Sequence, residues 1–445
     1  MKSHSLKARL ISDGAWAFSS RILTAVAGLV VNMLLTRLLT PLEVGAYFLT
    51  LSLVTAASIV AQLGLNHTVV RLVAESLSLN QPGRARMVVR YSLYLATLGI
   101  LVVNTILYLG LGEWLAMTLF ESPLMVKIMW VALLWIAVTA FQTLCSEILR
   151  GFSDIRLAAV FGGLITSVLA ALLLAMVWVW QGRSDLEQAA VLSIGACVAS
   201  ILVAGFFIEA KTRQLGTEGQ LNIKEMLLIS WPLLVIAITY FIHSQVDIWI
   251  LGIFHTQEAV AIYGTSARMT LLISIPIMVV NAVVMPVIAD MYAKDMKLEL
   301  ERVLQAAAAL AMIPAVLVFI GFAIIGGPLL AMMFGEFYRD GLSVLIMLSL
   351  GQIATISVGS AGYALMMTGH QNLMMYITLA ASIITIGLGL VLVRPYGATG
   401  VASASAAGLL VQAVAMCISV KKTIGIWTYV NFRQLPSLRS LLYIR

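Results

Sequence analysis

The sequence predicts an all-α membrane protein that crosses the bilayer many times. Its 445 residues are 61% hydrophobic and only 11% charged, and the mean hydropathy is +1.01. Apolar blocks without any charged residue, such as 44–66, 157–182 and 303–335, alternate with short polar breaks. A helix needs roughly 20 apolar residues to cross a bilayer. Because lipid offers the backbone no hydrogen-bond partner, each of these blocks must be helical.

Hydropathy and turn-forming residues divide the chain into twelve predicted helices. The first follows Lys2, Lys7 and Arg9 as in a signal peptide, but it is longer than a signal peptide's apolar region and no cleavage site marks it, so we expect it to be retained. The uncharged stretch 341–393 is divided at 369–372, Gly-His-Gln-Asn, a cluster of turn formers. The predicted helices are 15–37, 44–66, 88–110, 127–148, 157–180, 188–209, 229–252, 260–289, 303–326, 341–367, 373–393 and 398–420.

The distribution of basic residues predicts how these helices are oriented. An even number of crossings places both termini on one side, and that side carries twenty of the 27 lysines and arginines, whereas the loops of the other side carry five. Cytoplasmic loops are enriched in Lys and Arg, so the count predicts cytoplasmic termini. The same bias explains the net charge of +7, which therefore gives no reason to expect a nucleic-acid partner.

The two halves of the sequence resemble each other at an offset of about 216 residues. Residues 41–47 read Pro-Leu-Glu-Val-Gly-Ala-Tyr, and residues 257–263 read Gln-Glu-Ala-Val-Ala-Ile-Tyr. Six helices per half is an even number, so both halves insert the same way round, as two six-helix bundles related by a parallel repeat. We expect an N-terminal half at 1–216, a C-terminal half at 217–420 and a basic cytoplasmic tail at 421–445.

Several classes of protein are disfavoured by what the sequence lacks. Predicted helices and short loops use up the chain, which leaves no room for a separate soluble catalytic or nucleotide-binding domain. Cys145, Cys197 and Cys417 are scattered through apolar blocks without metal-ligand spacing. The sequence contains no Walker motif, metal motif or catalytic constellation. We therefore expect no enzyme, no catalytic residue, no metal and no cofactor.

Three segments carry motifs in a specific order. Residues 34–75 read LLTRLLTPLEVGAYFLTLSLVTAASIVAQLGLNHTVVRLVAE, residues 148–160 read ILRGFSDIRLAAV, and residues 244–269 read SQVDIWILGIFHTQEAVAIYGTSARM. Their order and spacing resemble those of bacterial polysaccharide-unit flippases, with a departure at Ala261, where that family more often has Gly. The resemblance implies the fold of the multidrug/oligosaccharidyl-lipid/polysaccharide exporter superfamily, with two six-helix bundles around a positively charged central cavity.

Four charged residues within predicted helices require an explanation, because a charge in the membrane is costly and usually faces a cavity or a partner. Asp247 and Arg268 lie within about one turn of each other in depth, given a rise of 1.5 Å per residue. One possibility is that the two residues form a structural ion pair. The other is that Arg268 faces the cavity. Arg21, in the first helix, faces the cavity, extends to the interface or pairs with Glu147.

Arginines are the leading candidates for substrate binding. The resemblance implies a lipid-linked sugar as substrate, whose diphosphate requires cationic partners inside the membrane, and the planar fork of arginine suits phosphate. Arg21 and Arg268 are therefore the first candidates, and His243 is the third. His243 lies four residues before Asp247, on the same helical face. Asp247 is either part of a proton or cation relay or part of a structural contact.

Seven amide side chains occur singly in different predicted helices. Each is expected to hydrogen-bond between helices, and some are expected to line the cavity. They are Asn32, Gln62, Asn104, Gln142, Asn281, Gln352 and Gln412.

The resemblance and the arginines together predict a flippase for undecaprenyl-diphosphate-linked oligosaccharide repeat units. It would work by alternating access in the bacterial cytoplasmic membrane, for synthesis of lipopolysaccharide or exopolysaccharide. The expected partners are the lipid-linked substrate, membrane lipids, a polysaccharide polymerase and glycosyltransferases. Two alternatives stay open: a cation-coupled exporter of small amphipathic molecules, and a membrane-embedded glycosyltransferase or ligase, which the short outer loops disfavour.

Overall fold

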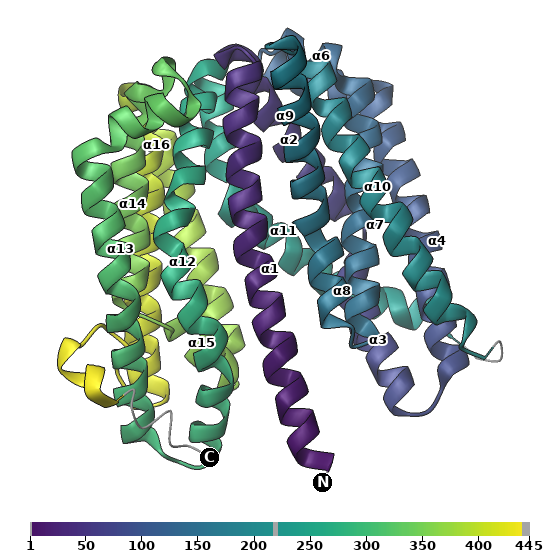
Figure 1. The fold of residues 1–445 in the computed structure, drawn as a ribbon, viewed down its shortest axis with the longest axis vertical. Coiled ribbons are helices and arrows are strands. Elements are labelled where there is room, and N and C mark those ends of the chain that lie inside the picture. The colour runs from purple at the N-terminus through teal and green to yellow at the C-terminus, as the bar shows by residue number, and fades with distance from the viewer. Residues whose placement is uncertain (1, 217–220, 438–445) are drawn as a thin grey trace. The chain divides into compact units, whose positions relative to one another are not determined.

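The computed structural model describes residues 2–216 and 221–437, and every regular element in these ranges is a helix. The chain forms two compact units, unit 1 (Met1–Gln245) and unit 2 (Val246–Arg445), and the division falls inside one long helix, α11 (Ile223–Phe254) (Figure 1). The predicted boundary between the halves lies at residues 217–220, and the end of the predicted tail lies at 438–445. Both are outside the described residues, so the limits of the two halves stay a prediction.

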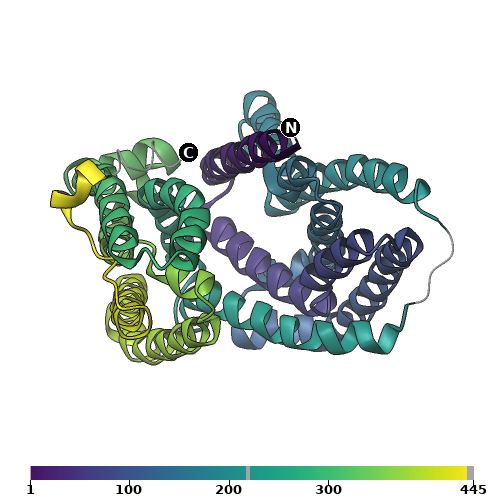
Figure 2. The ribbon, with the colours of Figure 1, turned by 90° about the horizontal axis from the view of Figure 1, so that it is seen from below.

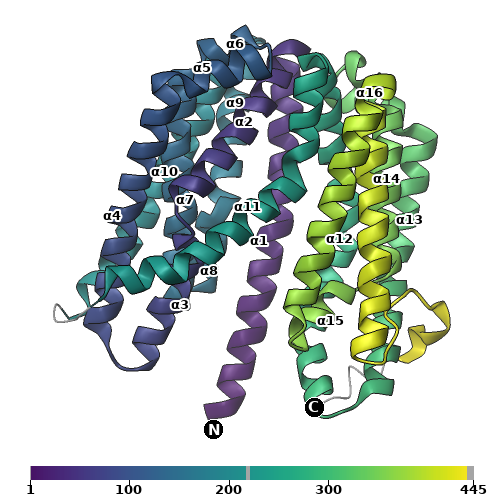
Figure 3. The same ribbon diagram turned by 180° about the vertical axis from the view of Figure 1, so that it is seen from behind.

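Eleven helical segments in the described ranges are long and apolar enough to cross a membrane, and the last of them contains two crossings. This segment, α16 (Gln371–Thr423), leaves helical geometry at Gly397, where φ is 55° and ψ is −135°. Gln412 Nε2 donates a hydrogen bond to Thr378 Oγ1 at 3.0 Å. Residues this far apart in one helix meet only if the arms before and after Gly397 run antiparallel, side by side (Figure 3). The predicted helices 373–393 and 398–420 are therefore the two arms of α16.

Unit 1 contains the first six crossings and the beginning of the seventh. Its helices are α1 (Lys2–Leu38), α2 (Pro41–Ala61), α3 (Leu65–Ser78), α4 (Pro82–Ile106), α5 (Gly112–Trp114), α6 (Pro123–Lys127), α7 (Met129–Gly151), α8 (Ile155–Ala159), α9 (Ile165–Gln181), α10 (Leu186–Arg213) and the first part of α11, with π-helical turns η1 (Leu107–Leu111), η2 (Leu115–Leu119) and η3 (Val160–Leu164).

Local sequence sets the beginning of α2. The Glu43 backbone N–H donates to Thr40 Oγ1 at 3.4 Å, and the Thr40 backbone N–H donates to Glu43 Oε2 at 2.9 Å. This reciprocal capping box satisfies N–H groups that a helix start leaves without partners. Pro41 occupies the first turn, where a missing N–H costs nothing.

The prediction of one continuous helix over residues 44–66 is wrong. The helix stops at Ala61 and resumes at Leu65, because Leu63 and Gly64 have φ values of 52° and 77°. A Cβ atom on Gly64 would lie 2.2 Å from the carbonyl oxygen of Ser230 on α11. The break therefore allows α11 to approach the backbone closely, which no side chain larger than hydrogen permits.

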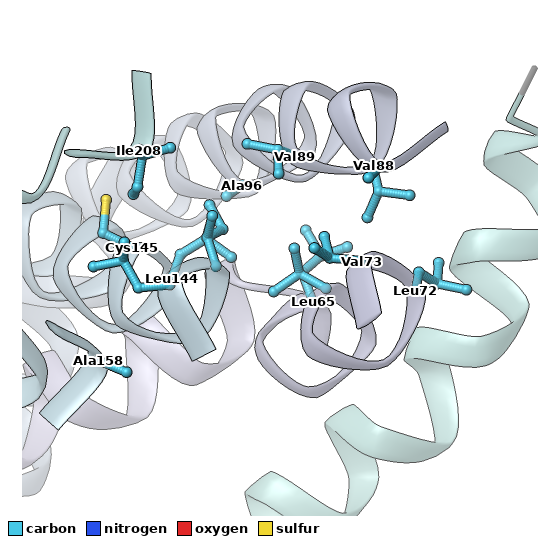
Figure 4. Packing of buried hydrophobic residues seen from close by; sticks show 14 of the residues in the cluster. Leu65, Leu72, Val73, Val88, Val89, Ala96, Leu144, Cys145, Ala158 and Ile208 are labelled. Atoms are coloured by element: carbon cyan, nitrogen blue, oxygen red, sulfur yellow. The ribbon is translucent and has the colours of Figure 1, made fainter. Parts of the chain in front are cut away.

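The core of unit 1 lies where α3, α4 and α7 pack together. The side chains that fill it are aliphatic or small and are almost fully buried (Figure 4). They include Leu65, Leu72, Val73, Val88, Val89, Ala96, Leu144, Cys145, Ala158 and Ile208. Such close packing at the end of the bundle fixes α3, so the break before it is a defined turn between two packed helices.

Unit 2 contains the end of α11 and the remaining crossings. Its helices, seen nearly end-on in Figure 2, pack side by side, with α12 against α13 and α14. They are α12 (Gln257–Ala293), α13 (Lys297–Phe334), α14 (Leu342–Ser357), α15 (Ala361–Met367) and α16, with 3₁₀ turns η4 (Glu336–Gly341) and η5 (Phe432–Ser437). The tenth predicted helix, 341–367, is also divided, at Gly359, where φ is 64°.

Candidate functional site

A carboxylate and two hydroxyls form a polar cluster where three membrane helices of unit 2 meet. Asp247 on α11 accepts hydrogen bonds through Oδ2 from the hydroxyl of Tyr263 on α12 and from Ser405 Oγ on α16, the latter at 3.3 Å. The Tyr263 and Ser405 oxygens are themselves 3.3 Å apart. Tyr263 is only 1% exposed, so its hydroxyl has protein partners in place of water. The Asp247 carboxylate is thereby held in place by donors from two other helices.

A matching tyrosine–serine pair occurs in unit 1. Tyr47 on α2 and Ser193 on α10 place their oxygens 3.1 Å apart, and both side chains are buried. Tyr47 precedes Tyr263 by the repeat offset of 216, and Ser193 precedes Ser405 by a similar distance. The residue 216 positions before Asp247 is Val31. The two bundles thus share the hydroxyl pair, and in unit 2 the Asp247 carboxylate accepts a hydrogen bond from each of the two hydroxyls.

Sequence reasoning found Asp247 but missed the residues that bind it. Tyr47 and Tyr263 were visible as matching positions of the internal repeat, yet a tyrosine in an apolar helix is usually a packing residue. Ser405 lies among several small residues on its helix and has no sequence signal of its own. The repeat was the available signal, because two tyrosines at one offset mark equivalent positions.

Arg268 and His243 are half-buried in membrane helices. Arg268 follows Tyr263 by five residues on α12, so it lies roughly 140° around the helix from the tyrosine at 100° per residue. The predicted pairing of Arg268 with Asp247 stays a prediction. His243 lies one helical turn before Asp247 on α11, as its sequence position requires.

Arg21 lies on α1 with an exposed side chain. Its predicted alternative partner Glu147 binds Arg150 instead, with Arg150 Nη1 donating to Glu147 Oε1 at 2.7 Å. Within the ranges that the structure describes, Arg21 forms no ion pair. A charged, exposed side chain in a membrane helix faces water, headgroups or a ligand.

The seven amides separate into two groups. Asn104, Gln142, Gln352 and Gln412 each hydrogen-bond to a neighbouring helix or helix arm, as predicted. Asn281 accepts a hydrogen bond from Ser360, in the turn between α14 and α15. Asn32 instead donates to Gly28 O in its own helix at 2.6 Å. Gln62, at the α2 break, is 2% exposed, and its Oε1 has no hydrogen-bond partner among the described residues. Most of these amides therefore hold helices together.

In the described part of the chain, no group of three or more histidine, cysteine, aspartate or glutamate side chains has the arrangement of a metal site. The three cysteines are free and buried.

Comparison with known proteins gives the relationship of this chain. The family described as "Polysaccharide biosynthesis protein" matches residues 10–292. A "probable low-salt glycan biosynthesis flippase Agl15" from Haloferax volcanii is 24% identical over 174 residues, which are 39% of this chain and 37% of that protein. The match thus spans little more than a third of the relative's own length.

Solved structures share the fold. An inward-facing multidrug resistance transporter of the MATE family, in the MOP superfamily, matches with a TM-score of 0.75 and 15% identity, over 90% of this chain and 94% of that one. The lipid II flippase MurJ in an inward closed conformation matches with a TM-score of 0.73 and 16% identity, over 96% and 90%. These similarities confirm the predicted exporter fold. By the match over residues 10–292, the chain belongs to the polysaccharide biosynthesis protein family.

Proposed function

We propose that this protein is a flippase for lipid-linked oligosaccharides, moving undecaprenyl-diphosphate-linked repeat units from the inner to the outer leaflet by alternating access. The main observation behind the proposal is that the chain belongs to a polysaccharide biosynthesis family and has an exporter fold. The glycan flippase among its relatives and the lipid II flippase among its fold neighbours support the same substrate class.

In this proposal the two arginines bind the diphosphate. Arg21 is exposed on a membrane helix, which is costly unless the charge meets water or an anion. Arg268 supplies a second cation in the other half of the chain, and His243 a third polar contact. Asp247, the carboxylate that unit 2 adds to the shared tyrosine–serine pair, couples transport to a proton or cation gradient.

The location and partners follow from the same proposal. The strong basic bias of one set of loops supports cytoplasmic termini in a bacterial cytoplasmic membrane. Glycosyltransferases would assemble the substrate on the inner leaflet, and a polymerase would consume it on the outer leaflet. The basic segment from residue 421 onward would then face the cytoplasm.

Substitutions at Arg21 test the substrate class in cells. Charge should matter more than shape at a diphosphate site, although lysine loses the bidentate fork. We expect Arg21→Lys to keep part of glycan export, and Arg21→Ala and Arg21→Glu to lose it at normal protein abundance. Surface polysaccharide and membrane protein are measured together. Arg37→Ala, at the other end of α1, is the matched control and should export normally. Full export by Arg21→Ala would contradict the proposal.

A second candidate function is favoured by the Asp247 cluster. A carboxylate held inside the membrane is the feature that a cation-coupled exporter of small amphipathic molecules would use. In that case, loss of the protein should sensitise cells to lipophilic cations and leave surface polysaccharide unchanged. The opposite pattern is expected for the flippase.

A further inference from the structure

The segment that follows α16 packs across one end of unit 2 rather than leaving it. Residues 424–437, here named the C-terminal strap, end in the turn η5 and lie beside α13 (yellow in Figure 1). Ile424, Ile426 and Thr428 alternate into the interior and are at most 3% exposed. Tyr429 and Phe432 point outward, with 44% and 54% of their surface exposed. The strap therefore has a buried face and an aromatic outer face.

Hydrogen bonds attach the strap to the second and third turns of α13. The Trp427 backbone N–H donates to Glu301 Oε2 at 3.1 Å, and Asn431 Nδ2 donates to Gln305 Oε1 at 3.0 Å. Gln305 Nε2 in turn donates to Glu301 Oε1 at 3.3 Å, and Gln305 is only 4% exposed. The buried amide is thus satisfied by the strap, which makes the docked position specific.

The strap also closes the break between α14 and α15. Ser357 is the last residue of α14, and its carbonyl lacks a donor within the helix. The Val430 backbone N–H of the strap donates to this carbonyl oxygen at 2.8 Å. A Cβ atom on Gly359 would lie 2.8 Å from the Thr428 carbonyl oxygen and 2.7 Å from Ala308 Cβ. The broken tenth helix is therefore enclosed between α13 and the strap.

The strap and the last turn of α16 carry basic and aromatic side chains. Arg433 is exposed on the strap, and Lys422 is exposed in the last turn of α16, just before the strap begins. Lys421, also in that turn, lies 5.4 Å above the ring of Trp427, which packs edge-on against Tyr429. These side chains begin where a membrane-spanning helix ends. Tyrosine, tryptophan and basic residues at the end of a membrane helix favour the membrane–water interface, where basic residues attract anionic lipid headgroups.

We propose that the C-terminal strap is a binding surface for anionic phospholipid headgroups, and that lipid bound there keeps the strap docked on the break in the tenth helix. The positive charges of Lys422 and Arg433 supply the attraction, and Tyr429 and Phe432 enter the interface. The composition of the membrane surface thereby controls how firmly the α14–α15 break is held.

A native cysteine reports on strap docking. Cys417 is 6% exposed, and the Thr428 hydroxyl in the strap donates to its sulfur at 3.8 Å, so alkylation requires the strap to move. The full-length protein carrying Cys145→Ser and Cys197→Ser is placed in nanodiscs of neutral or anionic phospholipid, and maleimide labelling of Cys417 is timed. We expect labelling about tenfold slower in the anionic lipid. Equal rates in the two lipids would overturn the proposal.

Variants separate lipid binding from docking. Lys422→Ala with Arg433→Ala should abolish the difference between the two lipids, whereas Arg339→Ala, at the opposite end of unit 2, should preserve it. Glu301→Ala should accelerate labelling in both lipids, and Glu299→Ala, an exposed carboxylate on the same helix, should not. A lipid dependence that survives in the double variant contradicts the lipid site, and an unchanged rate in Glu301→Ala contradicts the docking.

Discussion

At the scale of single residues, the most informative contrast is between Tyr47 and Tyr263. Both tyrosines are buried and both bind a serine on the last helix of their half. Tyr263 also donates to the Asp247 carboxylate, and the residue equivalent to Asp247 in the first half is Val31. Removing the Tyr263 hydroxyl therefore breaks its bonds to both Asp247 and Ser405, and it takes one of two donors from the carboxyl group.

Removing the two hydroxyls should expose this difference. We expect Tyr263→Phe to lower the free energy of unfolding by about 2 kcal/mol and Tyr47→Phe by about 1 kcal/mol, because Tyr263 loses its bond to Asp247 as well as its contact with Ser405. Thermal unfolding of the purified variants in detergent measures both. Equal losses would show that Asp247 adds nothing to the shared pair.

Asp247 and Arg268 need a test that separates a structural pair from a functional arginine. If they form a structural pair, Asp247→Ala and Arg268→Ala should each reduce folded protein in the membrane. Exchanging the two charges should then restore part of it, because the attraction does not depend on which helix carries which sign. Protein abundance is compared with glycan export. Normal abundance of Arg268→Ala with export abolished would reject the pair and support phosphate binding.

At the scale of helices, hydropathy predicted which segments cross the membrane but not where they break. The block 44–66 contains no charged residue, so its hydropathy does not mark the stop at Ala61. The break depends on Gly64 meeting the backbone of α11, about 160 residues further along the chain. The C-terminal strap depends in the same way on Glu301 and Ser357, which are distant in sequence. Contacts of this kind leave no local pattern.

A single methyl group at the break should be costly. Gly64→Ala places a Cβ atom 2.2 Å from the Ser230 carbonyl oxygen at a backbone φ of 77°, so we expect a loss of more than about 2 kcal/mol in unfolding free energy. Gly195→Ala, inside α10 with no atom within 4 Å of the new Cβ, should be neutral or stabilising by about 0.5 kcal/mol. The measurement is the Tm of each variant, which should be much lower for Gly64→Ala than for Gly195→Ala. Similar Tm values would show that the break at Gly64 is not tightly packed.

At the scale of the whole molecule, the repeat and the charge bias carried most of the sequence-based prediction. The repeat predicted two six-helix halves, and the resemblance of residues 34–75, 148–160 and 244–269 predicted the exporter fold, which the solved structures share. The candidate site was predicted less completely: Asp247 was named from its charge, whereas Tyr263 and Ser405 emerged only when three helices were brought together.

Topology is predicted for every loop at once. Reporter fusions at Leu215 and Asp295 should read cytoplasmic, and fusions at Asp185 and Glu258 should read periplasmic, because basic residues concentrate in the first set of loops. Paired phosphatase and fluorescent reporters give opposite signals on the two sides. A reversed signal at any of these four positions is incompatible with twelve crossings and cytoplasmic termini.

The central claim is that the protein moves a lipid-linked oligosaccharide across a bilayer, and a reconstituted vesicle measures this directly. Vesicles carrying the purified protein and a labelled undecaprenyl-diphosphate oligosaccharide are exposed to a glycosidase that cannot enter them. If the protein flips this lipid, substrate initially confined to one leaflet should become redistributed, and Arg21→Ala vesicles should resemble protein-free ones. Unchanged protection in wild-type vesicles, under an imposed proton or sodium gradient as well as without one, would contradict the account.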